Sequence, residues 1–163
     1  MTPEQLEGAA WQLQQFPSIL RRRLAGLCED VLHSKRSEAE FSVAENICHL
    51  RDIEREGYSV RLRRLLDEEQ PLLPDIDGAR LAQERGYNSQ PMPSALEDFA
   101  AERMRNVGII LGLRAEQLHC SGVLQTVGDI TVERLLAIME EHDREHLQLI
   151  EELLEAAPKP SSR

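Results

Sequence analysis

The chain has 163 residues and a formal net charge of −10, with 41% hydrophobic and only 4% aromatic residues. This length is enough for one domain with a sizeable core. A chain this acidic is a poor candidate for a nucleic-acid binder, which needs a basic surface. Because Leu, Glu, Ala and Arg are abundant and alternating patterns are scarce, the composition predicts an all-α protein.

Residues 1–15 are polar, unlike a secretory signal, and no apolar run approaches the roughly 18 residues that a membrane span needs. The cysteines, Cys28, Cys48 and Cys120, are odd in number and scattered, which is typical of reduced thiols. We therefore expect a cytoplasmic protein that does not bind membranes.

The first helical pattern begins at Thr2, where the sequence Thr2-Pro3-Glu4-Gln5 has the form of a capping box with a proline in the first turn. Its apolar stripe continues to about Leu27. Pro17 lies inside this stripe and must kink the helix or split it in two, because proline removes one backbone hydrogen bond. Residues 28–41 are predicted to be a connector, with His33 exposed.

The second helix is predicted to begin at Ser42, where Ser42-Val43-Ala44-Glu45 is another capping box, and to end near Glu68. Its buried side is marked by Val43, Ile47, Leu50, Ile53 and Val60. His49 falls within this wide stripe. The proline-rich residues 70–93 then form a connection too long for an ordinary loop, which predicts a crossover between two helices that run in the same direction.

The third helix is predicted to begin at Ser94 and to end near Gly112, followed by a short turn and a loop over residues 113–130. The fourth begins after Thr131 and runs to about Glu155. Four amphipathic helices predict a single four-helix bundle domain over residues 1–157, with residues 158–163 as a disordered tail.

The fourth helix carries two histidines, His142 and His146, on its apolar face. Because they are four residues apart, their side chains are neighbours and can converge on one ion. If the second and fourth helices are neighbours, His49 faces them. Three histidines with one open position form a catalytic metal site. The alternative is that these are core histidines hydrogen-bonded to buried polar groups.

Several stretches of the sequence, taken together and in this order, resemble a known family. They are residues 41–54 (FSVAENICHLRDIE), residues 99–103 (FAAER), and residues 128–132 (GDITV) leading into residues 142–147 (HDREHL). The chain thereby resembles the DinB/YfiT-like superfamily of small metal-binding four-helix bundles. Phe41 stands where a tryptophan is frequent in the family, and Glu145 stands where some members have another histidine.

The resemblance implies an up-down-down-up bundle with the long crossover between helices 2 and 3. It implies that His49, His142 and His146 are the metal-binding residues, that the ion is nickel, zinc or a related divalent metal, and that the protein is a homodimer. It also implies a metal-dependent enzyme. Since characterised relatives include thiol-dependent enzymes, we expect a detoxification-type S-transferase that uses a low-molecular-weight thiol as cosubstrate on a small molecule.

Two alternatives remain open: a metal-dependent hydrolase, and a non-catalytic, stress-associated metal-binding or interaction protein. The fourth metal position distinguishes them, since a site closed by Cys120 or Asp52 would be structural. Asp52 and Glu45 could also orient a histidine ligand or act as a base. The alternative for Asp52 is an exposed charge, and for Glu45 a helix cap. His119 and Cys120 form a weaker candidate pair.

Overall fold

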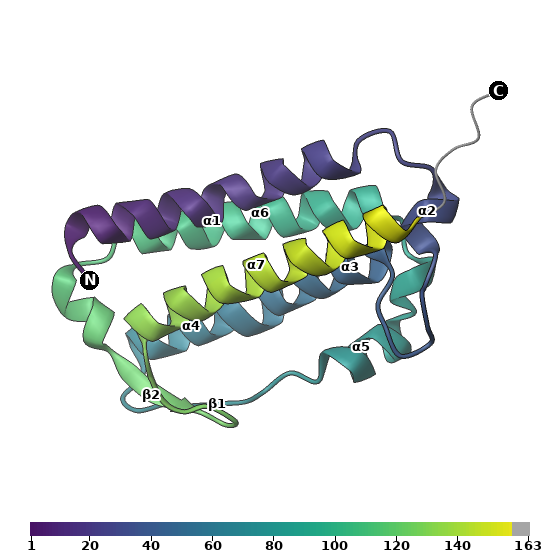
Figure 1. Ribbon diagram of the computed structural model, residues 1–163. Coiled ribbons are helices and arrows are strands. Elements are labelled where there is room, and N and C mark those ends of the chain that lie inside the picture. The colour runs from purple at the N-terminus through teal and green to yellow at the C-terminus, as the bar shows by residue number, and fades with distance from the viewer. Residues whose placement is uncertain (158–163) are drawn as a thin grey trace.

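Four long helical rods form the molecule in a computed structural model that describes residues 1–157; the tail predicted at residues 158–163 lies outside the described residues. The rods are α1 (Pro3–Leu24), the continuous rod of α3 (Val43–Asp52), η1 (Ile53–Tyr58) and α4 (Ser59–Asp67), α6 (Met92–Leu111), and α7 (Val132–Ala156). α1 and α3 each contact both α6 and α7. The rods run up-down-down-up (Figure 1), so the predicted bundle and its crossover are confirmed.

α1 is one helix across Pro17, so of the two predicted outcomes the split does not occur. Proline has no N–H, and the carbonyl of Leu13, four residues earlier, therefore loses its helical donor. The guanidinium of Arg103 in α6 donates to this Leu13 oxygen at 3.3 Å. A neighbouring helix thus supplies the hydrogen bond that Pro17 removes.

The second rod contains a π-helical turn, η1, between α3 and α4. A π turn holds more residues than an α turn, so it changes the face on which every later residue lies. Val60, predicted to be buried, is consequently 41% exposed, whereas Tyr58 and Leu62 are in the core. Extrapolating one α-helical stripe past residue 53 was therefore wrong.

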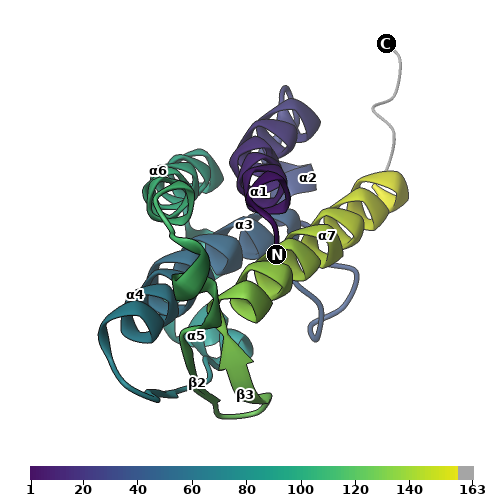
Figure 2. The same ribbon diagram turned by 90° about the vertical axis from the view of Figure 1, so that its left-hand side faces the viewer.

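The crossover contains β1 (Leu72–Leu73), α5 (Gly78–Arg85) and η2 (Tyr87–Ser89). It runs along the second rod on the side away from α1 and α6, as the two ribbon views show (Figures 1 and 2). Gly78 packs against the ring of His49. Earlier in the crossover, the Pro74 carbonyl accepts a hydrogen bond from Arg61 at 3.0 Å. The crossover therefore covers the face of the second rod that carries His49.

Residues 113–130, predicted as a turn and a loop, instead form η3 (Ala115–His119), β2 (Ser121–Leu124) and most of β3 (Gly128–Thr131). β2 pairs with β3 antiparallel and with β1 parallel, in the order β1-β2-β3. Gly122 allows this close pairing, because a Cβ there would come within 2.7 Å of the Pro71 carbonyl oxygen. The small sheet joins the crossover to the start of α7.

Two local predictions were also wrong. α6 begins at Met92 with Pro91 as its N-cap, so Ser94 lies within its first turn. His33 ends a short helix, α2 (Glu29–His33), and is half-buried. Its Nδ1 and Nε2 lie 2.7 Å and 2.9 Å from the Asn88 carbonyl and the Glu29 carboxylate. Among residues 1–157, no helix is both long enough and apolar enough to cross a membrane.

Candidate metal centre

Three imidazoles come together between α3 and α7. Each of His49, His142 and His146 offers a possible ligand nitrogen, and these atoms all lie within 4.8 Å of one another. The ring centroids are 5.3 Å apart for His49 and His142, 4.8 Å for His49 and His146, and 4.4 Å for the α7 pair. The structure therefore brings together all three histidines that the sequence predicted as ligands.

One pair of nitrogens in this group has the spacing of two ligands of one metal ion. The Nε2 atoms of His49 and His142 lie 3.3 Å apart. Two nitrogens bound tetrahedrally to zinc at about 2.0–2.1 Å would lie about 3.3 Å from each other. The residues present thus fit a tetrahedral divalent ion, with helix α3 supplying one ligand and helix α7 the other two.

All three histidines are neutral at pH 7. Burial lowers the pKa of His49 to about 4, that of His146 to about 3 and that of His142 to about 2. The neighbouring histidines lower the last two pKa values further, because two imidazolium ions cannot sit close together. Neutral imidazole is the form that binds metal ions, so the three histidines can bind an ion without first releasing a proton from an imidazolium.

Asn46 is a neighbour of this cluster that the sequence analysis missed. It lies on α3 one turn before His49, and its side-chain oxygen is 2.7 Å from Nδ1 of His146. The i, i+3 spacing to His49 was the available signal, because it puts both residues on one helix face. By contrast, Nδ1 of His49 and Nδ1 of His142 are buried and have no hydrogen-bond partner within residues 1–157.

Asp52 does not reach the histidines. Its carboxylate is buried and accepts hydrogen bonds from Arg51 at 2.7 Å, Arg55 at 3.2 Å, Arg85 at 2.5 Å and the Tyr87 hydroxyl at 2.7 Å. Since Arg85 and Tyr87 belong to the crossover, Asp52 holds α5 and η2 against α3. It is neither an exposed charge nor a hydrogen-bond partner of a histidine ring.

Glu45 is a helix cap, the alternative that the sequence analysis kept open for it. Its carboxylate accepts from the Ser42 backbone N–H at 2.8 Å and pairs with Lys35 at 3.1 Å. His119 and Cys120 lie where η3 meets β2 and are not part of the three-histidine group. The backbone carbonyl of Cys120 accepts a hydrogen bond from the Val132 N–H at 3.0 Å.

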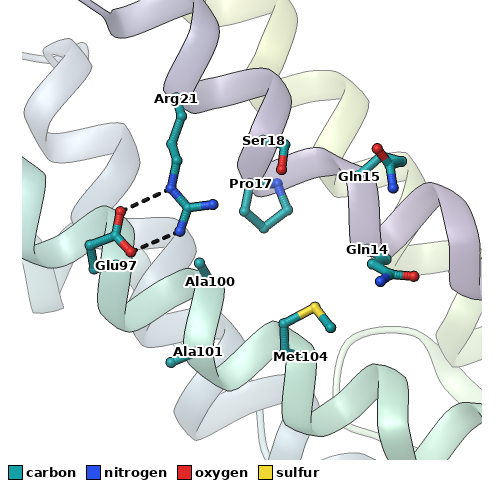
Figure 3. Close-up of a pocket in the computed structure, with 9 residues that line it drawn as sticks. All are labelled: Gln14, Gln15, Pro17, Ser18, Arg21, Glu97, Ala100, Ala101 and Met104. Atoms are coloured by element: carbon teal, nitrogen blue, oxygen red, sulfur yellow. Dashed lines mark hydrogen bonds and ion pairs between the residues drawn. The ribbon is translucent and has the colours of Figure 1, made fainter.

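A cavity of about 340 Å³ opens beside the cluster and is lined by both His146 and Asn46. Its walls include apolar side chains from the 34–42 connector, α5 and α7: Ala39, Phe41, Ala79, Leu149 and Leu153. A second cavity, of about 350 Å³, lies between α1 and α6, where Arg21 and Glu97 form a two-pronged ion pair (Figure 3). Of these two cavities, only the first is lined by a histidine of the cluster, His146, so it is the one from which a small molecule could approach the site.

This chain is similar to known proteins over most of its length. A family model described as the DinB superfamily matches residues 12–150. A protein of Oceanobacillus iheyensis named "Putative metal-dependent hydrolase OB0413" is 25% identical over 136 residues, which cover 83% of this chain and 78% of that protein. YfiT from Bacillus subtilis, described as a probable metal-dependent hydrolase with an unusual four-helix bundle topology, superposes with a TM-score of 0.88 at 20% identity. The match covers 95% of this chain and 89% of that one, and it supports the fold.

Proposed function

We propose that this chain, which belongs to the DinB superfamily, is a divalent-metal-dependent hydrolase whose ion is held by His49, His142 and His146. The observation that carries the proposal is the convergence of three imidazoles from two helices, with His146 buried and His49 and His142 half-buried. The name of the Oceanobacillus relative supports the reaction class. Nickel and zinc are the ions we propose, because imidazole ligands suit both.

The fourth position of the site favours catalysis over a structural metal. Within residues 1–157, no Asp, Glu or Cys joins the three histidines as a fourth ligand. Asp52 is held by arginines and Tyr87, and Cys120 lies outside the group. A three-ligand site that leaves one position to water or substrate is typical of catalytic ions. The cavity of about 340 Å³ beside His146 has room for a small substrate next to the site.

Two aromatic rings and a glycine lie close to His49 and His142. The Phe41 ring lies 5.5 Å from that of His49, the Tyr58 ring lies 5.7 Å from that of His142, and Gly78 packs directly on His49. When bound, a divalent ion would supply Lewis acidity that activates water or polarises a substrate carbonyl. Low-dielectric walls strengthen such electrostatic effects at the open side next to His146.

The thiol S-transferase that the sequence analysis placed first finds no support in the relatives, whose names and descriptions specify hydrolases. We therefore propose the hydrolase, which was the alternative, and no observation assigns a thiol cosubstrate. Transferase activity, seen as turnover that requires an added thiol, is one possible outcome of the experiment below.

Elemental analysis of the untagged protein tests the proposal, with His142→Ala as the site variant and His119→Ala as a matched control outside the cluster. We expect about one ion per chain in the wild type and the control, and loss of the ion in His142→Ala. Ester and amide substrates are then offered to the zinc- and nickel-loaded proteins, with and without an added thiol. Hydrolysis that disappears in His142→Ala supports the proposal. Absence of metal uptake, or turnover only with a thiol and an electrophile, would overturn it.

A further inference from the structure

We infer that Asn46 is a positioning residue that fixes His146 in one tautomer, with a proton on Nδ1 and a bare Nε2 available for a ligand. This inference deepens the proposed function, because its consequence for metal affinity rests on that function. The tautomer itself does not depend on any metal.

The contact is short and buried. The Asn46 side-chain oxygen and Nδ1 of His146 lie 2.7 Å apart, across 100 residues of sequence. Asn46 is 1% exposed and His146 is 8% exposed. Water is therefore a poor competitor for this hydrogen bond, and the two groups must satisfy each other.

The orientation of the Asn46 amide determines which partner donates. Its nitrogen, Nδ2, lies 2.8 Å from the backbone carbonyl of Ser42. A carbonyl can only accept, so the amide NH₂ must point to Ser42 and the amide oxygen to His146. That oxygen can also only accept, so Nδ1 of His146 must carry the proton. A neutral imidazole protonated at Nδ1 has its free lone pair on Nε2.

The other two histidines lack this control. Nδ1 of His49 and Nδ1 of His142 have no hydrogen-bond partner in the described part of the chain. Their Nε2 atoms are 3.3 Å apart. Two bare lone pairs would repel at this distance, so in the metal-free protein one of these rings must carry an Nε2 proton and donate it to the other. Of the three histidines, His146 is therefore the one whose tautomer is fixed by a hydrogen bond to another side chain, whereas either of the other two rings can carry the Nε2 proton.

Asn46 also ties the site to the start of α3. Ser42 is the N-cap of that helix, and its side chain accepts from the Glu45 backbone N–H at 3.1 Å. The series from the Ser42 carbonyl through Asn46 to His146 thus links the first turn of α3 to α7. Because the Asn46 amide is hydrogen-bonded through both its nitrogen and its oxygen, it fixes the orientation of the His146 ring as well as the position of its proton.

The test is the tautomer of His146 in the metal-free protein, read from long-range ¹H–¹⁵N NMR correlations of the histidine rings. The variants are Asn46→Leu, which removes the acceptor, and Asn46→Asp, which keeps an acceptor oxygen. Asn106→Leu is the matched control, since Asn106 is also a buried asparagine but bonds to Glu54 and Ser59 instead. Zinc affinity is measured in parallel by competition with a chelator.

We expect the Nδ1–H form in the wild type, in Asn46→Asp and in Asn106→Leu. In Asn46→Leu we expect this preference to be lost and zinc affinity to fall by about 10- to 100-fold. An Nε2–H form in the wild type, or an unchanged tautomer or zinc affinity in Asn46→Leu, would overturn the inference. If Asn46→Leu does not fold, the wild-type and Asn46→Asp spectra still decide it. A wild-type protein that takes up neither zinc nor nickel refutes the proposed function instead, whereas the tautomer is read without metal.

Discussion

Replacing Arg103 by methionine should lower the free energy of unfolding by about 3–5 kcal/mol, because buried carboxylates would lose their counter-charge. Arg103 is fully buried. Its guanidinium donates to Glu54 at 2.9 Å and to the two oxygens of Asp143 at 2.5 Å and 2.9 Å. Glu54 and Asp143 are themselves buried. Methionine fills a similar volume, so the loss would come from charge and hydrogen bonds rather than from a cavity.

Neutralising the two carboxylates should restore most of this stability. In the triple variant Arg103→Met, Glu54→Gln, Asp143→Asn, no buried charge remains unpaired, and replacing a whole buried ionic group is often neutral. The amide oxygen that Glu54→Gln introduces could still accept from Asn106, as the Glu54 carboxylate does at 2.7 Å. Each carboxylate change alone, with Arg103 intact, should be destabilising, because it leaves the guanidinium with less counter-charge.

The Leu13 carbonyl gives a second, finer test of the same network. In Arg103→Met this carbonyl loses the donor that replaces the missing Pro17 N–H. Pro17→Ala returns that N–H. It should therefore stabilise the Arg103→Met protein by about 1 kcal/mol more than it stabilises the wild type, the usual net value of one hydrogen bond.

Urea unfolding of the metal-free proteins at pH 7, followed by far-UV circular dichroism, measures these differences. The slopes against urea must stay equal for the free energies to be compared. A loss below about 1 kcal/mol in Arg103→Met, or a triple variant no more stable than the single one, would refute the reasoning. If Arg103→Met is too unstable to purify, folding of the triple variant carries the same test.

Three further predictions follow from the site and its cover. Gly78→Ala should weaken zinc binding at least about tenfold, because a Cβ there would lie 2.5 Å from the His49 ring. The control Gly8→Ala should leave zinc binding unchanged, because a Cβ at Gly8 would have no atom within 4 Å. Arg85→Met should speed amide hydrogen exchange in α5 by roughly tenfold, since Arg85 binds Asp52 across the crossover, and unchanged exchange would contradict that role. The metal-free protein should lose stability as the pH falls below 6.5, because burial holds the folded-state pKa values of the three site histidines at about 4, 2 and 3, so that only the unfolded chain binds those protons. The slope should approach about 1.4 kcal/mol per pH unit for each histidine and be shallower when one is replaced, and stability that is flat between pH 7 and 5 would refute it.

The sequence by itself determined the four long rods and the crossover that joins the second rod to the third. The capping boxes at Thr2 and Ser42 mark the starts of α1 and α3 in the structure. α7 likewise starts directly after Thr131, whose side chain accepts from the Arg134 backbone N–H at 3.2 Å. The four-residue spacing of His142 and His146 put both on one helix face. All these features depend on groups within about one helical turn of each other, which is why local pattern is sufficient.

Only the tertiary structure decided how the buried polar groups are satisfied. Asn46 meets His146 across 100 residues, Arg103 meets the Leu13 carbonyl across 90, and Asp52 meets Arg85 across 33. No periodicity encodes such partners, because each depends on which helices pack together and on their rotation. The π turn in the second rod changes that rotation for the residues that follow it, which exposes Val60. A buried polar group must find a partner wherever packing places one, so its role is fixed by the assembled bundle and not by its own segment.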